Sequence, residues 1–183
     1  MAVAVGMGTY WNPWRLMGWG GALVLLLAPA IAMQFTREVN WGPEDFVFAA
    51  ILMGSVGLGL ELAMRSSTSR AFRAAVALAL LAGFLQTWAD AAVGIVGDGE
   101  HPANMMFRGI TVMALAGCWI ARFRPDGMSR AMLVVGVGEI IAALLAATGS
   151  SEYRILLPLG GFAGLWLLSA FLFHMAAREA SAV

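Results

Sequence analysis

The chain has 183 residues, of which 61% are hydrophobic and 12% are charged, and its mean hydropathy is +0.81. A soluble domain carries about 25% charged residues. These values therefore exclude a soluble globular, disordered or collagen-like protein and indicate that a lipid bilayer surrounds most of the chain. Eleven basic residues balance eleven acidic ones, and a single cysteine, Cys118, excludes an internal disulfide and a cysteine-based metal cluster.

Six apolar stretches follow one another along the chain, each close to the ~20 residues that cross the hydrocarbon core of a bilayer. They cover residues 17–33, 45–64, 74–97, 105–121, 128–148 and 153–176. The breaks between them are too short to hold a separate soluble domain. We therefore predict an all-α polytopic membrane protein, a six-transmembrane-helix bundle with short loops that forms a single domain over residues 1–183. The first stretch is interpreted as a retained helix, because only Arg15 precedes the apolar run and no clean Ala-x-Ala cleavage site follows it before Arg37.

The arginines divide unequally between the two sets of flanks that alternate along such a bundle. One set carries eight of them, namely Arg15, Arg65, Arg70, Arg73, Arg122, Arg124, Arg130 and Arg178. The other set carries three, namely Arg37, Arg108 and Arg154. Because cytoplasmic loops collect basic residues, this distribution predicts that the N- and C-termini are both cytoplasmic.

Glu139 is the first candidate for a functional residue. It lies about ten residues from either end of the fifth stretch, near the bilayer midplane at ~1.5 Å per residue. A charged carboxylate at that depth costs ~2.5–3.5 kcal/mol on insertion scales. We expect Glu139 to face the bundle interior and to be paired, hydrated or protonated. Two interpretations stay open: a relay for protons or cations, or a neutral side chain that hydrogen-bonds a neighbouring helix.

Asp90 lies on the third stretch within a stripe of small and polar residues spaced three, four and seven apart. The stripe comprises Gly83, Gln86, Thr87, Asp90 and Gly94, and we expect it to face inward. The third and fourth stretches form an antiparallel hairpin, so Arg108 can reach Asp90. An ion pair between them would reduce the desolvation cost of both groups. A structural pair and an acid–base site below the outer surface are both compatible with this arrangement.

The two outer loops carry further acidic and polar side chains. These are Glu38, Asn40, Glu44 and Asp45 in the first loop, and Asp98, Glu100, His101 and Asn104 in the second. Oxygen-rich groups of this kind suit Ca²⁺ or Mg²⁺, but no dedicated motif is present and no metal site is predicted. The competing interpretation is a solvated acidic outer mouth, in which Asp45 and Asn104 instead cap the second and fourth helices.

No cofactor is predicted. His101 and His174 fall on opposite membrane faces in this topology, which excludes a haem held by both. No Gly-x-Ser-x-Gly, His-Glu-x-x-His or phosphate-binding loop occurs in the sequence. Glu61 and Arg65 stand four residues apart near a helix end and are interpreted as an ordinary ion pair.

Several short segments between the first and fifth stretches show a recognisable pattern. They are Met33-Gln34-Phe35-Thr36-Arg37-Glu38-Val39-Asn40-Trp41 followed by Asp45-Phe46, then Gly94-Ile95-Val96-Gly97, Pro102-Ala103-Asn104 and Ala121-Arg122-Phe123-Arg124-Pro125. Together they resemble an uncharacterised family of small bacterial polytopic inner-membrane proteins with no assigned activity. The resemblance runs through roughly two thirds of the chain. It implies a bacterial inner (cytoplasmic) membrane location and no reaction, and Asp90 stands where the pattern has a neutral residue.

Three classes of function remain. The first is permeation or transport of small cations or protons through intramembrane acids, with Glu139, Asp90 and Arg108 as relay candidates. The second is an accessory or scaffold subunit of a larger membrane complex, and the third, ranked last, is an intramembrane enzyme that acts on lipid. The expected partners are membrane lipid and either further copies of this chain or a membrane-complex partner. Nucleic acid is not among them.

Overall fold

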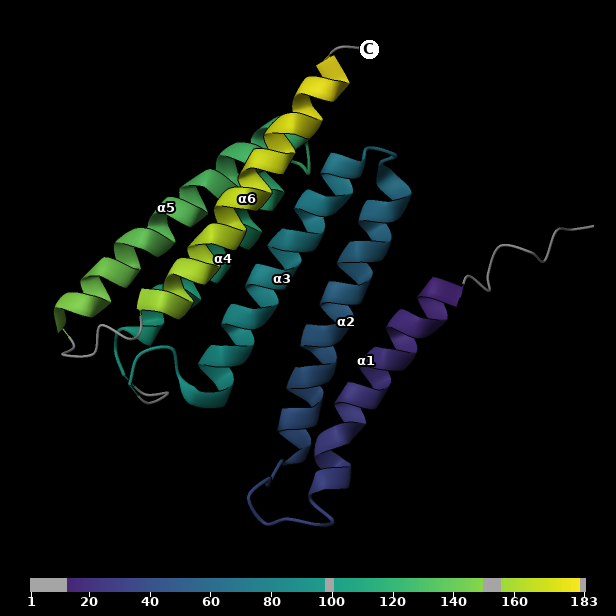
Figure 1. Ribbon diagram of the computed structural model, residues 1–183, viewed down its shortest axis with the longest axis vertical. Helices are drawn as coiled ribbons and strands as arrows, with labels where there is room; N and C mark the ends of the chain where they lie inside the picture. The colour runs from purple at the N-terminus through teal and green to yellow at the C-terminus, as the bar shows by residue number, and fades with distance from the viewer. Residues whose placement is uncertain (1–12, 98–100, 150–155, 182–183) are drawn as a thin grey trace, which may run out of the picture. The chain divides into compact units, whose positions relative to one another are not determined.

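The computed structural model describes residues 13–97, 101–149 and 156–181. In that part of the chain the regular structure consists of six α-helices, with no strands (Figure 1). The helices are α1 (Pro13–Ala32), α2 (Pro43–Ser66), α3 (Arg70–Val93), α4 (Asn104–Ile120), α5 (Pro125–Gly149) and α6 (Leu156–Ser181). Each predicted apolar stretch therefore corresponds to one helix, and the predicted all-α class is confirmed.

Five of these helices are long and apolar enough to cross a membrane, namely α1, α2, α3, α5 and α6. The helix α4 is equally apolar in character but has 17 residues, fewer than the ~20 that span the hydrocarbon core. Length and composition thus indicate a multi-pass membrane protein.

The chain forms two compact units, Met1–Leu58 and Gly59–Val183. In the first unit, the ring of Trp19 from α1 lies against α2 at Gly57, where an added Cβ would be 2.7 Å from it. Gly57 therefore leaves the room that this ring occupies. Gly54, one turn earlier, has no side chain of a described residue within 4 Å of such a Cβ. The single domain over the whole chain stays a prediction.

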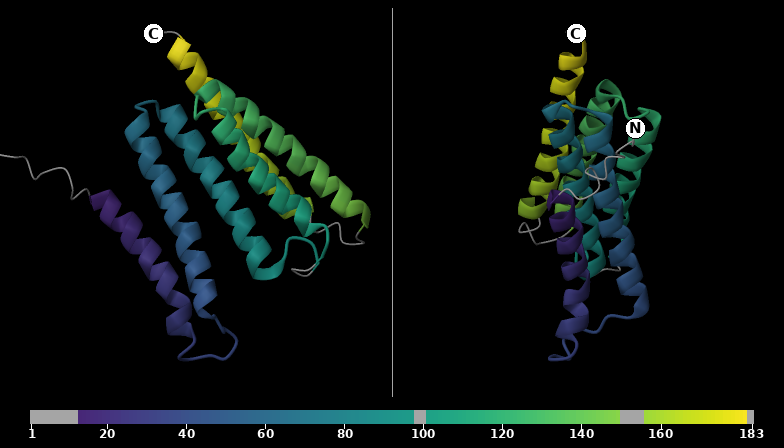
Figure 2. Two further views of the ribbon diagram at one scale, coloured as in Figure 1. Left: turned by 180° about the vertical axis from the view of Figure 1, so that it is seen from behind. Right: turned by 90° about the vertical axis from the view of Figure 1, so that its right-hand side faces the viewer.

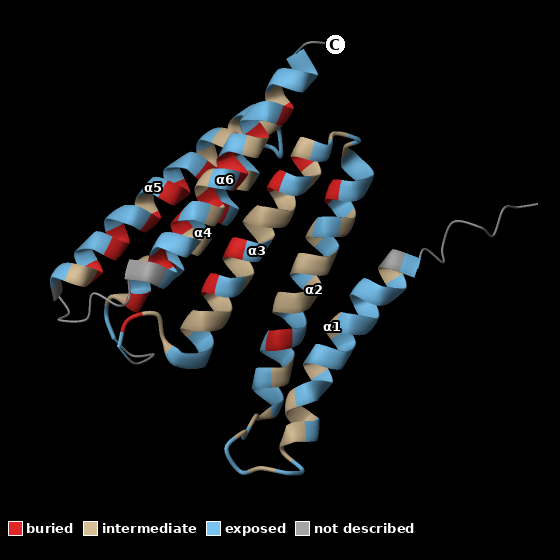
Figure 3. Ribbon diagram, viewed as in Figure 1, coloured by how far each residue is buried: buried red, intermediate tan, exposed pale blue. Residues whose placement is uncertain are grey.

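In the second unit, α3, α4, α5 and α6 form a four-helix bundle (Figures 1 and 2). The helix α6 packs against both α5 and α3, α4 packs against α5, and the contact between α3 and α4 is the least extensive. Buried residues concentrate on the facing sides of these helices, as Figure 3 shows in red. The fully buried hydrophobic side chains include Phe107, Met132, Val135, Leu159 and Phe173.

The helix α3 begins and ends for identifiable local reasons. Ser69 precedes it, and its Oγ accepts a hydrogen bond of 3.1 Å from the backbone N–H of Phe72, which is a standard N-terminal cap. The helix stops at Val93 because Gly94 adopts φ 75°, a left-handed conformation that glycine tolerates. The prediction that the third helix continues to residue 97 was therefore wrong at its C-terminal end.

The start of α2 is stabilised by Asp45. Its Oδ2 accepts a hydrogen bond of 2.8 Å from the backbone N–H of Gly42, which would otherwise lack a partner in the helix. The interpretation of Asp45 as a capping residue is confirmed.

Asn104 was interpreted as the cap of the fourth helix, and this was wrong. Ala103 occupies the N-cap position and makes no side-chain capping bond. The Asn104 side chain instead turns back toward the chain that enters the helix, where it bonds the backbone of Ile95 and Val96.

The turn between α4 and α5 holds two consecutive residues in the left-handed region, Arg122 at φ 51° and Phe123 at φ 57°. Their backbone N–H groups donate to the carbonyls of Trp119 and Cys118, at 3.0 and 3.2 Å, and so close the end of α4. This conformation costs non-glycine residues about 1–2 kcal/mol each. Pro125, whose fixed φ suits a first helical position, then starts α5.

Candidate functional site

Glu139 is buried in the middle of the second unit, with a relative exposure of 0%. At 1.5 Å per residue it lies about 21 Å from the first residue of α5 and about 15 Å from the last. Neither carboxyl oxygen makes a hydrogen bond to any residue that the structure describes. The expectation that Glu139 faces the bundle interior is confirmed, whereas an ion-pair partner for it is not found among the described residues.

The polar side chain beside Glu139 is Gln86, which comes from α3 and is 1% exposed. Two other contacts fix the orientation of the Gln86 amide. Its Nε2 donates to the carbonyl oxygen of Phe107 at 3.0 Å, and its Oε1 accepts from the indole Nε1 of Trp166 at 3.2 Å. Gln86 therefore links α3 to α4 and α6 while its amide stands next to the Glu139 carboxyl group.

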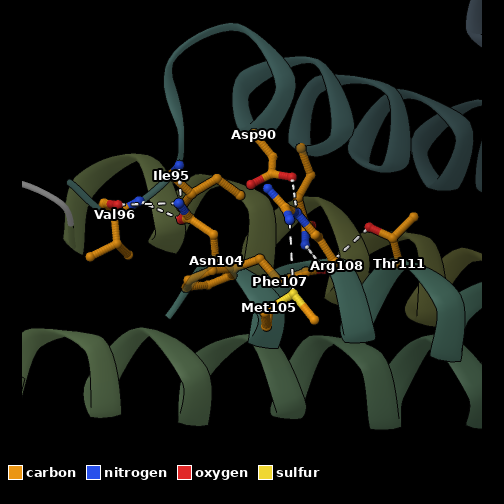
Figure 4. Close-up of polar contacts among 9 residues, drawn as sticks. Asp90, Ile95, Val96, Asn104, Met105, Phe107, Arg108 and Thr111 are labelled. Atoms are coloured by element: carbon orange, nitrogen blue, oxygen red, sulfur yellow. Dashed lines mark hydrogen bonds and ion pairs between the residues drawn. The ribbon is translucent and has the colours of Figure 1, made fainter. Parts of the chain in front are cut away.

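Asp90 lies one helical turn beyond Gln86 and forms the predicted ion pair with Arg108. The Arg108 Nε donates to Asp90 Oδ2 at 2.6 Å, with relative side-chain exposures of 49% for Arg108 and 12% for Asp90. Figure 4 shows the Asp90 carboxyl group facing the guanidinium across the gap between α3 and α4. The second oxygen, Oδ1, is buried and has no hydrogen-bond partner in the described part of the chain.

A cavity of about 180 Å³ opens beside this ion pair. We call it the α3–α4 cavity, and its lining residues are Gln86, Thr87, Asp90, Ile95, Phe107, Arg108, Thr111 and Val112. The cavity thus combines two hydroxyl groups, an amide and an ion pair with apolar walls. Because Gln86 lines it and also adjoins Glu139, the two candidate regions of the sequence are connected through one side chain.

Asn104 holds the backbone of Ile95, one of the residues that line this cavity. Its Oδ1 accepts hydrogen bonds from the backbone N–H groups of Ile95 and Val96, at 3.1 and 2.8 Å, and its Nδ2 donates to the Val96 carbonyl at 3.3 Å (Figure 4). Asn104 is 1% exposed. Such a buried amide fixes the backbone that follows α3, and the structure assigns it this structural role.

The outer acidic mouth divides between the two units. Glu38, Asn40, Glu44 and Asp45 belong to the first unit, His101 and Asn104 belong to the second, and Asp98 and Glu100 lie outside the described residues. His101 accepts a hydrogen bond at Nδ1 from the backbone N–H of Ala103, at 3.2 Å. Within residues 13–97, 101–149 and 156–181, no group of three or more His, Cys, Asp or Glu side chains is placed to hold a metal ion.

Two surface ion pairs follow the i, i+4 spacing on helices. Arg65 contacts Glu61 at 2.6 Å, as predicted, and Arg130 contacts Asp126 at 2.8 Å. Both lie toward helix ends and are ordinary helix-surface pairs.

Comparison with known protein families, with curated proteins and with solved structures finds no match to this chain. The site therefore has to be interpreted from its own geometry. The sequence pattern identified Gln86 and Thr87 as part of an inward-facing stripe, and both line the cavity. It missed Trp166, because nothing in the sequence indicates that this residue of α6 faces Gln86.

Proposed function

We propose that this protein conducts protons or small cations across the membrane through Glu139. The observation that carries the proposal is the fully buried carboxyl group of Glu139, whose oxygens have no hydrogen-bond partner in the described chain. A buried polar group without a partner costs free energy. A residue retained at that cost in a membrane interior is a candidate for ion or proton transfer.

The connection to the α3–α4 cavity supports the same proposal. The cavity is lined by Thr87, Asp90 and Thr111 and has room for the water that carries a proton to them. Gln86 then separates the cavity from Glu139. The arrangement provides polar groups from near the end of α3 to the middle of α5, with Asp90 and Arg108 at the entrance.

The test is proton flux into liposomes that contain the purified protein, followed with an internal pH-sensitive dye. The change is Glu139→Gln, which preserves shape and removes the titratable group. The matched control is Asp126→Asn, an acid at the exposed end of α5. We expect flux in the wild type and in the control, and flux at the level of protein-free liposomes for Glu139→Gln. Equal flux in all three proteins, or no flux in the wild type, would refute the proposal.

Replacing the proton gradient by a K⁺ or Na⁺ gradient distinguishes the transported species. If the protein is a proton relay, Glu139→Gln abolishes the proton flux, and the wild type shows no current when the gradient is K⁺ or Na⁺. A cation path shows a current that depends on the cation supplied. Circular dichroism and size-exclusion profiles of each variant show that loss of flux does not reflect loss of folding.

For the membrane and the orientation, we propose a bacterial inner membrane with both termini in the cytoplasm. Within the second unit, Arg70 and Arg73 at the start of α3 and Arg178 at the end of α6 lie at one end of the bundle, together with the α4–α5 turn (Figures 1 and 2). This distribution agrees with cytoplasmic retention of basic loops. In a Cys118→Ala background, an impermeant maleimide applied outside intact cells should label His101→Cys and leave Ser67→Cys unlabelled.

The second candidate function is an accessory or scaffold subunit of a larger membrane complex. One observation favours it: none of the described residues in the apolar window of α1 is buried. A partner helix, as well as lipid, could cover this surface. Gentle extraction from the host membrane followed by native mass measurement separates the two functions. A stoichiometric second polypeptide supports the subunit role, and a homo-oligomer without one supports transport.

A further inference from the structure

The α3–α4 cavity lies at the depth of the membrane interface. Asp90 is three residues before the last residue of α3, and Arg108 is four residues after the first residue of α4. Both therefore stand about 5–6 Å inside their helix ends. With 24 residues, α3 is about 36 Å long, whereas the hydrocarbon core is about 30 Å thick. The ion pair thus falls near the boundary between acyl chains and headgroups.

The hydrogen-bonding groups in the cavity match an uncharged head that both donates and accepts. The Oδ1 of Asp90 is covered by the protein, so Asp90 acts here through its ion pair with Arg108 and not as a direct acceptor. The guanidinium of Arg108 provides only donors, and the hydroxyl groups of Thr87 and Thr111 provide both kinds. The opposite charges of Asp90 and Arg108 offset each other, so neither an ammonium group nor a phosphate group gains from a net charge there.

The walls of the cavity suit the carbon atoms that follow such a head. Val112 lines it and is 64% exposed, which places it at the outer surface of the bundle. Ile95 and Phe107 add apolar surface. The contact between α3 and α4 is the least extensive of the four packed helix pairs in the bundle, and the Arg108 side chain is half exposed. The described residues of the second unit therefore leave the cavity partly open along the α3–α4 seam.

From these observations we infer that the α3–α4 cavity binds the hydroxyl-bearing, glycerol-type head of a membrane amphiphile, whose acyl chain leaves past Val112. A head hydroxyl accepts from the half-exposed Arg108 guanidinium or exchanges a hydrogen bond with a threonine hydroxyl, and Asp90, whose Oδ1 is covered by the protein, holds Arg108 in place. A volume of about 180 Å³ corresponds to about six water molecules, which accommodates a small polyol head and excludes a large sugar headgroup. This inference goes beyond ion conduction. A bound head would occupy the cavity through which the proposed function lets protons enter, and the binding test is therefore separate from the flux test with Glu139→Gln.

The test is equilibrium binding of radiolabelled 1-monooleoylglycerol to the full-length protein in detergent micelles. The first variant, Thr111→Leu, fills the cavity and keeps the ion pair. Its matched control is Thr148→Leu, because Thr148 is an exposed threonine on α5 that likewise bonds a backbone carbonyl of its own helix. The second variant, Asp90→Asn, has Asp126→Asn as its control, since Asp126 also pairs with an arginine.

We expect saturable binding to the wild type and to both controls. Thr111→Leu fills the cavity, and Asp90→Asn takes from Arg108 the charge that holds it in place. Each change should therefore weaken binding by about tenfold, the effect of one lost hydrogen bond to a charged group. Equal binding by all five proteins would overturn the inference. Where one variant fails to fold by circular dichroism, the other decides the result.

Two competitors identify the source of the head. Free glycerol should displace the labelled lipid only at far higher concentration, because it lacks the acyl chain. Displacement by glycerol at a concentration equal to that of unlabelled 1-monooleoylglycerol would overturn the membrane-amphiphile assignment in favour of a soluble polyol. Methyl oleate, which has the chain without hydroxyl groups, should compete weakly. Competition equal to that of 1-monooleoylglycerol would show that the head is not recognised, and this too would overturn the inference.

Discussion

The carboxyl groups of Glu139 and Asp90 lie in two regions of the same helical unit, and their surroundings differ in kind. Near the end of α3, Asp90 has a guanidinium at 2.6 Å. In the middle of α5, Glu139 is fully buried beside an amide, and no described residue hydrogen-bonds its oxygens. The ion pair accounts for one oxygen of the first acid, Asp90 Oδ2, and leaves Oδ1 buried without a described partner. No described pair accounts for the second acid, which is why the functional proposal rests on Glu139.

Neighbouring polar groups make the contrast sharper. Ser169 is also fully buried, and its hydroxyl donates to the Ala75 carbonyl at 2.8 Å. Gln86 is almost fully buried, and one of its two N–H donors and its acceptor oxygen are bonded. Buried polar side chains in this bundle are therefore generally bonded, as in other proteins. Asp90 departs from that rule at one oxygen, and Glu139 departs from it at both. The following three predictions test this difference.

The largest change in stability is expected for Gln86→Leu. The substitution removes two buried hydrogen bonds and leaves the indole N–H of Trp166, which is 2% exposed, without its acceptor. We expect the free energy of unfolding in detergent to fall by about 2–4 kcal/mol. The control is Gln34→Leu, an exposed glutamine that bonds the carbonyl of Ala30, and it should change stability by less than about 0.5 kcal/mol. Equal effects would mean that Gln86 does not hold the three helices together.

A change of opposite sign is expected for Glu139→Met, which keeps an unbranched side chain and removes the carboxyl group. Because that group has no described hydrogen-bond partner, its removal should raise the free energy of unfolding by about 1–3 kcal/mol. In the comparison variant Ser169→Ala, a satisfied hydroxyl is lost, and stability should fall by about 0.5–1.5 kcal/mol. A loss of stability in Glu139→Met would show that the carboxyl group is structural and would break the comparison.

The smallest effect is expected at the exposed ion pair of α5. Asp126→Asn removes a pair whose side chains are 66% and 78% exposed, and surface pairs of this kind contribute little. Its melting temperature should stay close to that of the wild type, with a loss below about 0.5 kcal/mol. Asp90→Asn should lower the melting temperature more, because Asp90 is 12% exposed and its partner loses a charged contact. Equal melting temperatures would show that the Asp90–Arg108 pair contributes as little to stability as the exposed pair of Asp126 and Arg130.

The helices were largely predictable from the sequence, because apolar stretches of membrane-spanning length leave few alternatives. The pair of Asp90 and Arg108 was predictable too, since antiparallel neighbours joined by one connection must face each other. The end of α3 was not, because its position depends on the backbone conformation of Gly94. The sequence does not indicate whether a glycine inside an apolar stretch continues a helix or ends it.

The site around Glu139 was predictable only in part. Its depth and its inward orientation followed from its place in the fifth stretch, and Gln86 followed from the stripe on the third. Trp166 did not, because its contact with Gln86 joins residues 80 positions apart and depends on which helix packs against α3. The bonds from Asn104 to Ile95 and Val96 could not be predicted either, because they depend on how the chain turns after α3.

The left-handed backbone at Arg122 and Phe123 has a mechanical consequence for the bundle. It joins α4 to α5 through residues 121–124, a corner closed by its own hydrogen bonds, whereas α3 and α4 are joined through the longer connection 94–103. A corner closed in this way fixes the angle at which α5 leaves α4. The orientation of α4 is therefore set mainly from its α5 side, where its packing is also more extensive than against α3.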